Sequence, residues 1–246
     1  MAEYQTIRSV GAGARAARID EGLRAHMNKV YGLMSVGMLL TGGVAWAFGT
    51  SDVLFALLRD PMTLKPNILG WVVMFAPLVM VFAFGAVINR LSYTAAQLFF
   101  YAYAAVMGLS LSWIFAAFTG VSIAQTFLIT AIAFASLSLF GYTTKRNLSG
   151  LGTFFMMGLI GLAVAMIVNI FLASSALSFA ISVIGVLLFA GLTAYDTQNI
   201  KNTYLEHAQM GDSEWLGKAA IMGALQLYLD FINLFMFLLQ FMGNRE

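Results

Sequence analysis

Two aspartates, Asp196 and Asp230, are the residues of this sequence best suited to carry chemistry. Asp230 lies deep inside a long apolar segment, where inserting a charged carboxylate into a membrane costs about 2.5–3.5 kcal/mol. A residue with that cost usually has both a function and a partner. Gln226, Asp230, Asn233 and Gln240 recur at i, i+4, i+7 and i+14, which is one face of a helix. The spacing predicts a polar stripe that faces the interior of a helical bundle.

The partner of Asp230 is found by counting along the chain. Gly211 is a typical helix stop, and Asp212 or Ser213 is a typical N-cap for the helix that follows. Asp196 and Asp230 each lie 17 residues from position 213, which is roughly 25 Å along a helix. An antiparallel hairpin of two helices therefore places both carboxyl groups at similar depth, provided that the first helix continues beyond its apolar part.

Two facing carboxyl groups in a medium of low dielectric constant do not both ionise cheaply, so they would share a proton. Loss of that proton would push the helices apart, or a cation would bridge them. Ca²⁺ prefers oxygen ligands, and the pair with Gln226 and Asn233 could hold it weakly, as permeation requires. The alternative is a proton-sharing pair that only joins two helices.

Arg90 is the basic residue considered as a counter-ion of this pair. It lies just before a predicted span, on the same side of the membrane as Asp196, and could form a buried or partly buried ion pair with it. An anchor at the level of the lipid head groups is an equally good interpretation of Arg90.

Other kinds of chemistry have few candidate residues. The chain has no cysteine, which excludes disulfides, thiolate catalysis and cysteine-based zinc sites. His26 and His207 both lie outside the predicted spans, so no histidine cluster is available to bind a metal. An intramembrane aspartyl protease would need Gly-x-Gly-Asp, whereas Asp230 follows Leu-Tyr-Leu. We therefore expect no enzyme activity and no bound cofactor.

The elements that must position the two aspartates are membrane-spanning helices. Hydrophobic residues make up 61% of the 246 residues and charged residues only 10%, against about 25% charged in soluble proteins. Seven apolar segments are each long enough to cross a hydrocarbon core of about 30 Å. They are residues 30–49, 70–89, 93–117, 121–141, 151–172, 176–195 and 219–242.

The fold class predicted is an all-α membrane protein, with residues 1–29 as an N-terminal tail and 30–246 as a seven-helix transmembrane domain. Residues 15–29 are either a short interfacial helix or part of a solvated tail. Ten Lys and Arg residues lie on the same side of the membrane as the N-terminal tail and three on the opposite side, which predicts a cytoplasmic N-terminus. The first span is too long for the apolar part of a signal peptide, which predicts that it is not cleaved. The net charge of +2 is too small to indicate nucleic-acid binding.

Three segments resemble the Bax inhibitor-1 (transmembrane Bax-inhibitor-motif) family. They are AYDTQNIK at 194–201, LQLYLDFINLF at 225–235 and GYTTKRNL at 141–148. The resemblance implies a seven-helix bundle with the seventh helix central, and a pH-sensitive Ca²⁺ leak. It also implies that titration of an aspartate pair matching Asp196 and Asp230 is linked to closed and open states, and that an arginine matching Arg90 holds the closed pair.

The sequence and this resemblance together predict a pH-sensitive Ca²⁺ leak channel of the bacterial inner membrane. Its partners would be the lipid bilayer, Ca²⁺ and protons. The resemblance links eukaryotic members to suppression of cell death and some bacterial members to a membrane-bound AAA protease, which is a candidate partner. Two alternatives stay open: a regulatory or interaction protein with a structural aspartate pair, and a proton-coupled cation exchanger.

Overall fold

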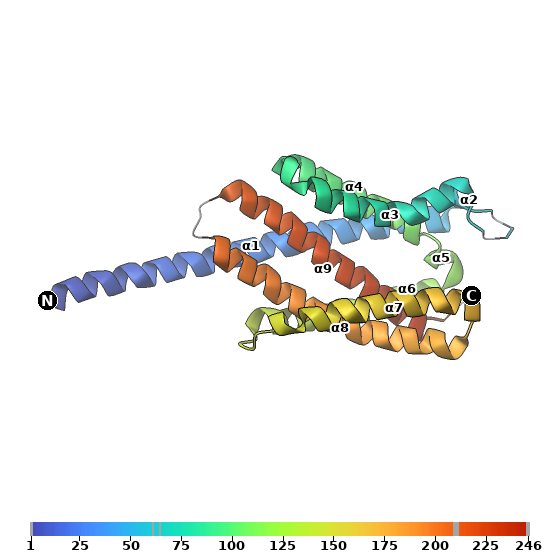
Figure 1. Ribbon diagram of the computed structural model, residues 1–246. Coiled ribbons are helices and arrows are strands. Elements are labelled where there is room, and N and C mark those ends of the chain that lie inside the picture. The colour runs from blue at the N-terminus through green and yellow to red at the C-terminus, as the bar shows by residue number, and fades with distance from the viewer. Residues whose placement is uncertain (1, 61, 64, 209–211, 245–246) are drawn as a thin grey trace.

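The computed structural model describes the backbone of residues 2–60, 62–63, 65–208 and 212–244, and within these ranges the side chains other than those of residues 2–17 and 213. The described chain folds into a bundle of long helices (Figure 1). The long helices are α1 (Ala2–Thr50), α3 (Ile68–Val87), α4 (Tyr93–Leu111), α6 (Gly120–Thr143), α7 (Gly152–Leu172), α8 (Ser175–His207) and α9 (Ser213–Met242). The short elements are α2 (Asp52–Leu58), η1 (Ile88–Arg90), α5 (Ile114–Ala117) and η2 (Ser149–Leu151).

Seven helical segments of the described chain are long and apolar enough to cross a membrane. They overlap all seven predicted spans in the predicted order, so the all-α, seven-span fold is confirmed. The connections that the predicted spans leave short are also short in the structure. For example, α7 ends at Leu172 and α8 begins at Ser175.

The last spanning helix, α9, is the centre of the bundle. Its apolar stretch is 67% buried, whereas the corresponding values for the other spans range from 11% to 39%. It packs against α1, α4, α6 and α8, while α3 and α7 lie at the periphery with most of their surface free for lipid (Figure 1). The central seventh helix expected from the family resemblance is therefore present.

The part of α1 just before the first predicted span packs against the rest of the bundle. Leu23, His26 and Met27 are buried, and the ring of His26 lies 4.9 Å from that of Tyr204 on α8, measured between centroids. Residues 18–29 thus continue into the first spanning helix without a break, and the part from Leu23 onward packs against the bundle. The reason is that Leu23 and Met27, four residues apart, share one helix face, and α8 is long enough to cover it. The assignment of residues 1–29 as a cytoplasmic tail stays a prediction.

The hairpin of α8 and α9 has the expected form. α8 continues past its apolar part to His207, and Asp212 is the N-cap of α9, where its Oδ1 accepts a hydrogen bond of 2.9 Å from the Trp215 backbone N–H. The rings of His207 and Trp215 stack across the connection at 4.0 Å. The predicted stop at Gly211 lies outside the described residues.

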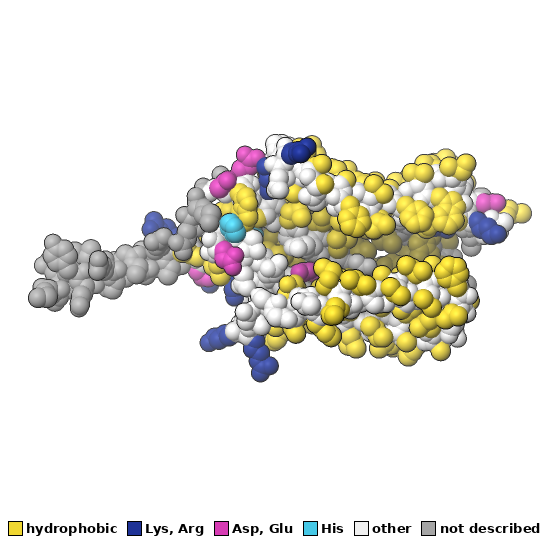
Figure 2. Space-filling view, in the orientation of Figure 1, with side chains coloured by type: hydrophobic (Ala, Val, Ile, Leu, Met, Phe, Trp, Pro, Cys, Tyr) yellow, Lys and Arg dark blue, Asp and Glu magenta, His cyan; other side chains and the backbone are white. Residues whose placement is uncertain are grey.

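Basic side chains are distributed unequally between the two ends of the bundle. Figure 2 shows most of the coloured Lys and Arg near the end from which the N-terminal segment extends, and a smaller group at the opposite end. This arrangement agrees with the count of basic residues along the sequence. The cytoplasmic location of the N-terminus stays a prediction.

Candidate functional site

Asp196 on α8 and Asp230 on α9 lie side by side, with their carboxyl groups close enough to interact directly. Asp230 is only 4% exposed, and Asp196 is partly buried. A carboxylate can only accept hydrogen bonds, so a bond between two carboxyl groups requires that one of them carries a proton. The structure therefore brings together the two aspartates that the antiparallel count placed at one depth.

One oxygen of the pair has no partner. Within the part of the chain that the structure describes, Asp230 Oδ2 is the single buried side-chain nitrogen or oxygen that makes no hydrogen bond. Leaving such an atom unsatisfied costs about 1–3 kcal/mol, and native proteins keep few of them. This oxygen, in a carboxyl group beside Asp196, is thus an acceptor that a proton or a cation can use.

The helix that carries Asp230 is polar along one stripe, but its amides do not all turn toward the pair. The Asn233 Nδ2 donates to the backbone oxygen of Leu229 in the same helix at 2.8 Å, and Gln226 is partly buried. Near the far end, Gln240 accepts a hydrogen bond of 3.5 Å from Ser182 on α8. A supporting role of Gln226 and Asn233 in an ion pathway stays a prediction.

Arg90 is not brought to the pair. It is exposed at the end of η1, and neither of the ion pairs found between described residues includes it. The reason is that α3, which leads into η1, packs mainly against α4 and α2 and not against α8. The exposed position suits the anchor interpretation better than the counter-ion interpretation.

Three hydroxyl groups near Asp196 form a chain that the sequence reasoning missed. The Tyr31 hydroxyl on α1 lies 2.6 Å from Ser138 Oγ on α6, and Ser138 Oγ lies 2.9 Å from Thr197 Oγ1 on α8. Thr197 in turn donates to the Thr193 backbone oxygen at 2.7 Å. The three residues come from distant parts of the chain with no common spacing, so no sequence pattern singles them out.

The described residues include no group of three or more His, Asp or Glu side chains placed to hold a metal ion. A role of Asp196 and Asp230 as cation ligands stays a prediction.

A family model described as "Inhibitor of apoptosis-promoting Bax1" matches residues 23–246. The chain belongs to the Bax inhibitor-1 family. The match starts at Leu23, which is the first buried residue in the described part of α1.

Bacterial members of the Bax inhibitor-1 family are similar over nearly the whole chain. The inner membrane protein YbhL of Escherichia coli is 47% identical over 225 residues, which cover 92% of this chain and 94% of YbhL. An uncharacterised protein of Caulobacter vibrioides is 45% identical, covering 97% and 96% of the two chains. The protein RP147 of Rickettsia prowazekii is 45% identical, covering 92% of both. With the seven spans, these relatives confirm an integral protein of the bacterial inner membrane.

Two of the segments that resemble the Bax inhibitor-1 family contact each other. Gln198 accepts a hydrogen bond of 2.7 Å from the Leu148 backbone N–H and donates one of 2.8 Å to the Arg146 backbone oxygen. Lys201 Nζ donates to the Tyr142 backbone oxygen at 2.7 Å. Side chains that flank Asp196 in sequence thus hold the connection after α6 in place, which positions α8 beside α6.

Gly141 is the point at which α6 and α8 approach most closely near the site. A Cβ atom at this position would overlap the backbone carbonyl oxygen of Ala194 and lie 2.9 Å from the Ala194 Cα. Both contacts are to backbone, which cannot move aside as a side chain could. Small residues at such crossings allow helix backbones to pack closely in membranes, and this crossing sets the position of α8 two residues before Asp196.

We expect Gly141→Ala to lower the stability of the protein by about 1–3 kcal/mol, since the added methyl group forces α6 and α8 apart. Thermal unfolding of the purified protein in detergent measures the effect. Gly161→Ala on α7 is the matched control, because its Cβ would meet no atom within 4 Å and alanine favours the helix. Equal melting temperatures for the two variants would contradict the tight crossing.

Proposed function

We propose that this Bax inhibitor-1 family protein provides a pH-sensitive Ca²⁺ leak across the inner membrane, controlled by the Asp196–Asp230 pair. The observation that carries the proposal is the close approach of two carboxyl groups between α8 and the central helix α9, where Asp230 has a buried oxygen without a hydrogen-bond partner. The family is not a known enzyme class, and the proposal assigns no catalytic residue and no cofactor. Ca²⁺ is the transported ion.

The shared proton explains how the pair responds to pH. While one proton lies between the two carboxyl groups, it holds α8 against α9. Loss of this proton leaves two negative charges in a medium of low dielectric constant, where their repulsion is far stronger than in water. The helices then separate, or a cation takes the place of the proton.

A cation bound by this pair would be held weakly. Ca²⁺ takes 6–8 oxygen ligands when it is bound tightly, whereas the pair supplies the carboxylate oxygens of two residues. Conduction requires a site that an ion can both enter and leave. Gln226 and Asn233, on the same face of α9, are the candidates for additional oxygen ligands along the pathway. The charge distribution supports a cytoplasmic N-terminus, which would place both aspartates toward the cytoplasmic half of the bundle.

Reconstituted liposomes test the proposal. We expect purified protein to give Ca²⁺ flux above that of protein-free liposomes, and we expect the flux to rise as the pH is raised, since higher pH removes the shared proton. Ca²⁺ is followed with an enclosed indicator and protons with a second dye. Flux equal to that of empty liposomes at every pH would reject the leak. A proton counter-flux in fixed ratio to Ca²⁺ would favour an exchanger.

A regulatory protein is the second candidate. The observation in its favour is that the two carboxyl groups lie between α8 and α9, so a proton shared by them could serve only to hold the bundle together. Under this alternative, the protein gives no flux in liposomes, and substitutions of the pair change its stability alone. A membrane-bound AAA protease is then the candidate partner, and co-purification with such a protease is its test.

A further inference from the structure

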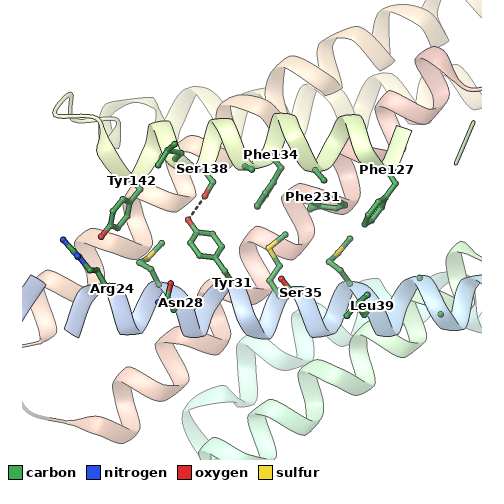
Figure 3. A pocket seen from close by; sticks show the side chains of 18 of the residues that line it. Arg24, Asn28, Tyr31, Ser35, Leu39, Phe127, Phe134, Ser138, Tyr142 and Phe231 are labelled. Carbon is green, nitrogen blue, oxygen red and sulfur yellow. Dashed lines mark hydrogen bonds between the residues drawn. The ribbon is translucent and has the colours of Figure 1, made fainter. Parts of the chain in front are cut away.

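A long groove lies between α1 and α6 (Figure 3). Its volume is about 1110 Å³, which exceeds the ~300–1,000 Å³ of typical small-molecule pockets. Phe231 of α9 contributes to the lining. The Tyr31 and Ser138 hydroxyls, 2.6 Å apart, join the two walls at one level. The function proposed above does not use this space.

The polarity of the groove changes along its length in the same direction on both walls. On α1, Asp20, Arg24 and Asn28 line one end, while Met38 and Leu39 line the part beyond Tyr31. Figure 3 shows Arg24 and Asn28 at one end of the labelled set and Leu39 at the other. The charged side chains thus lie at one end, and apart from Ser35 the α1 side chains beyond Tyr31 are apolar, which matches an amphipathic ligand.

The wall formed by α6 runs antiparallel and repeats this gradient. Tyr142 and Ser138 face the end lined by Arg24, and Phe134 and Phe127 face the end lined by Leu39 (Figure 3). From Tyr31 to Gly43, the last lining residue of α1, the apolar part measures about 18 Å. One leaflet contributes about 15 Å of hydrocarbon, so this part has the length of an acyl chain.

At the polar end of the groove, a positive charge lies closer to the apolar part and a negative charge lies farther out. Arg24 Nη2 lies 3.1 Å from Asp20 Oδ2, and both side chains are largely exposed. Asp20 lies one helical turn farther from the apolar part than Arg24. An exposed ion pair of this kind is weak, so a ligand with its own charges can replace it. From the apolar part outward, the groove offers hydroxyl and amide groups, then a cation, then an anion.

We propose that this groove binds a phospholipid with a primary ammonium head group. The acyl chain lies along α1 and α6 beyond Tyr31, and the ester groups lie at the level of the Tyr31 and Ser138 hydroxyls. The phosphate contacts Arg24, whose guanidinium suits phosphate oxygens. The ammonium donates to Asp20. A trimethylated head group has no N–H to donate, and a glycerol head group has no cation.

The head-group preference is measured by native mass spectrometry. The full chain in detergent is mixed with equal amounts of phosphatidylethanolamine, phosphatidylcholine and phosphatidylglycerol that carry the same acyl chains. We expect phosphatidylethanolamine to be retained about tenfold over the other two lipids, equivalent to about 1.4 kcal/mol. Asp20→Asn should abolish this preference, and Arg24→Gln should lower retention of all three lipids.

The matched control for Asp20→Asn is Glu214→Gln. Glu214 is also exposed and pairs with a basic residue four positions later, Lys218, but neither residue lines the groove. Equal retention of the three lipids by the wild-type protein would overturn the proposal, as would a preference for phosphatidylglycerol. The proposal would also be overturned if the Asp20→Asn variant kept the wild-type preference for phosphatidylethanolamine as fully as the Glu214→Gln variant does.

The apolar part of the groove is tested by filling it. Ala135 on α6 is exposed to the groove, so Ala135→Trp should occupy the acyl-chain path and reduce retention of phosphatidylethanolamine severalfold. Ile132→Trp is the control, because Ile132 is 61% exposed on the same helix and does not line the groove. Equal retention by these two variants would reject the groove as the binding site.

Discussion

Asp230→Asn is expected to remove the pH-dependent part of the Ca²⁺ flux and to lower the remaining flux about tenfold or more, which corresponds to ~1.4 kcal/mol of lost cation interaction. An amide cannot release a proton in this range of pH, so the repulsion that separates α8 from α9 no longer develops. The amide also carries no charge to attract the cation. Flux of the reconstituted variant, measured over the same pH series as the wild-type protein, gives the result.

Asp212→Asn is the matched control for this substitution. Asp212 lies on the same helix but is exposed at its N-cap, where asparagine caps as well as aspartate. Its flux and pH profile should equal those of the wild-type protein. If Asp230→Asn and Asp196→Asn both leave flux and profile unchanged, the assignment of the pair is wrong, even though the leak itself would survive.

Tyr228→Ala is expected to cause the largest loss of stability, about 3–5 kcal/mol, since it leaves a cavity at the centre of the bundle. Tyr228 is fully buried on α9, and its ring packs edge-on against those of Phe100 and Tyr103 from α4. Its hydroxyl lies 2.7 Å from Thr41 Oγ1 on α1, which donates to the Ala104 backbone oxygen at 2.8 Å. This one side chain therefore connects α1, α4 and α9.

Thermal unfolding in detergent separates packing from hydrogen bonding at this position. Tyr228→Phe keeps the ring and removes one hydrogen bond, and Thr41 keeps its bond to Ala104, so we expect a loss of only about 1 kcal/mol. Phe82→Ala is the control for a large side chain that faces outward, because Phe82 is 72% exposed. A melting temperature of Tyr228→Ala equal to that of Phe82→Ala would contradict the central role of Tyr228.

The membrane-spanning helices could be predicted because the signal is local. A helix must satisfy its own backbone hydrogen bonds in lipid, so a run of about 20 apolar residues indicates a span without reference to the rest of the fold. The relation between Asp196 and Asp230 was predictable for a similar reason. A short connection makes neighbouring helices antiparallel, and a fixed rise per residue converts a residue count into depth.

Rotation of each helix about its axis could not be predicted in the same way. Whether Asp196 turns toward Asp230 depends on the crossing of α6 and α8 at Gly141, where backbone meets backbone. The same limitation explains Arg90, which was predicted on the same side of the membrane as Asp196 but whose helix packs elsewhere. It also explains the hydroxyl chain from Tyr31 through Ser138 to Thr197, because three single residues on separate helices share no pattern.

The sequence by itself determined the number and order of the spans, the excess of basic residues on one side and the common depth of the two aspartates. These properties follow from composition and from distance along the chain. Only the tertiary structure decided that the carboxyl groups meet, that Arg90 stays at the surface and that a groove opens between α1 and α6. Each of these depends on which faces of distant helices touch, and that is settled by side-chain packing, which no local pattern records.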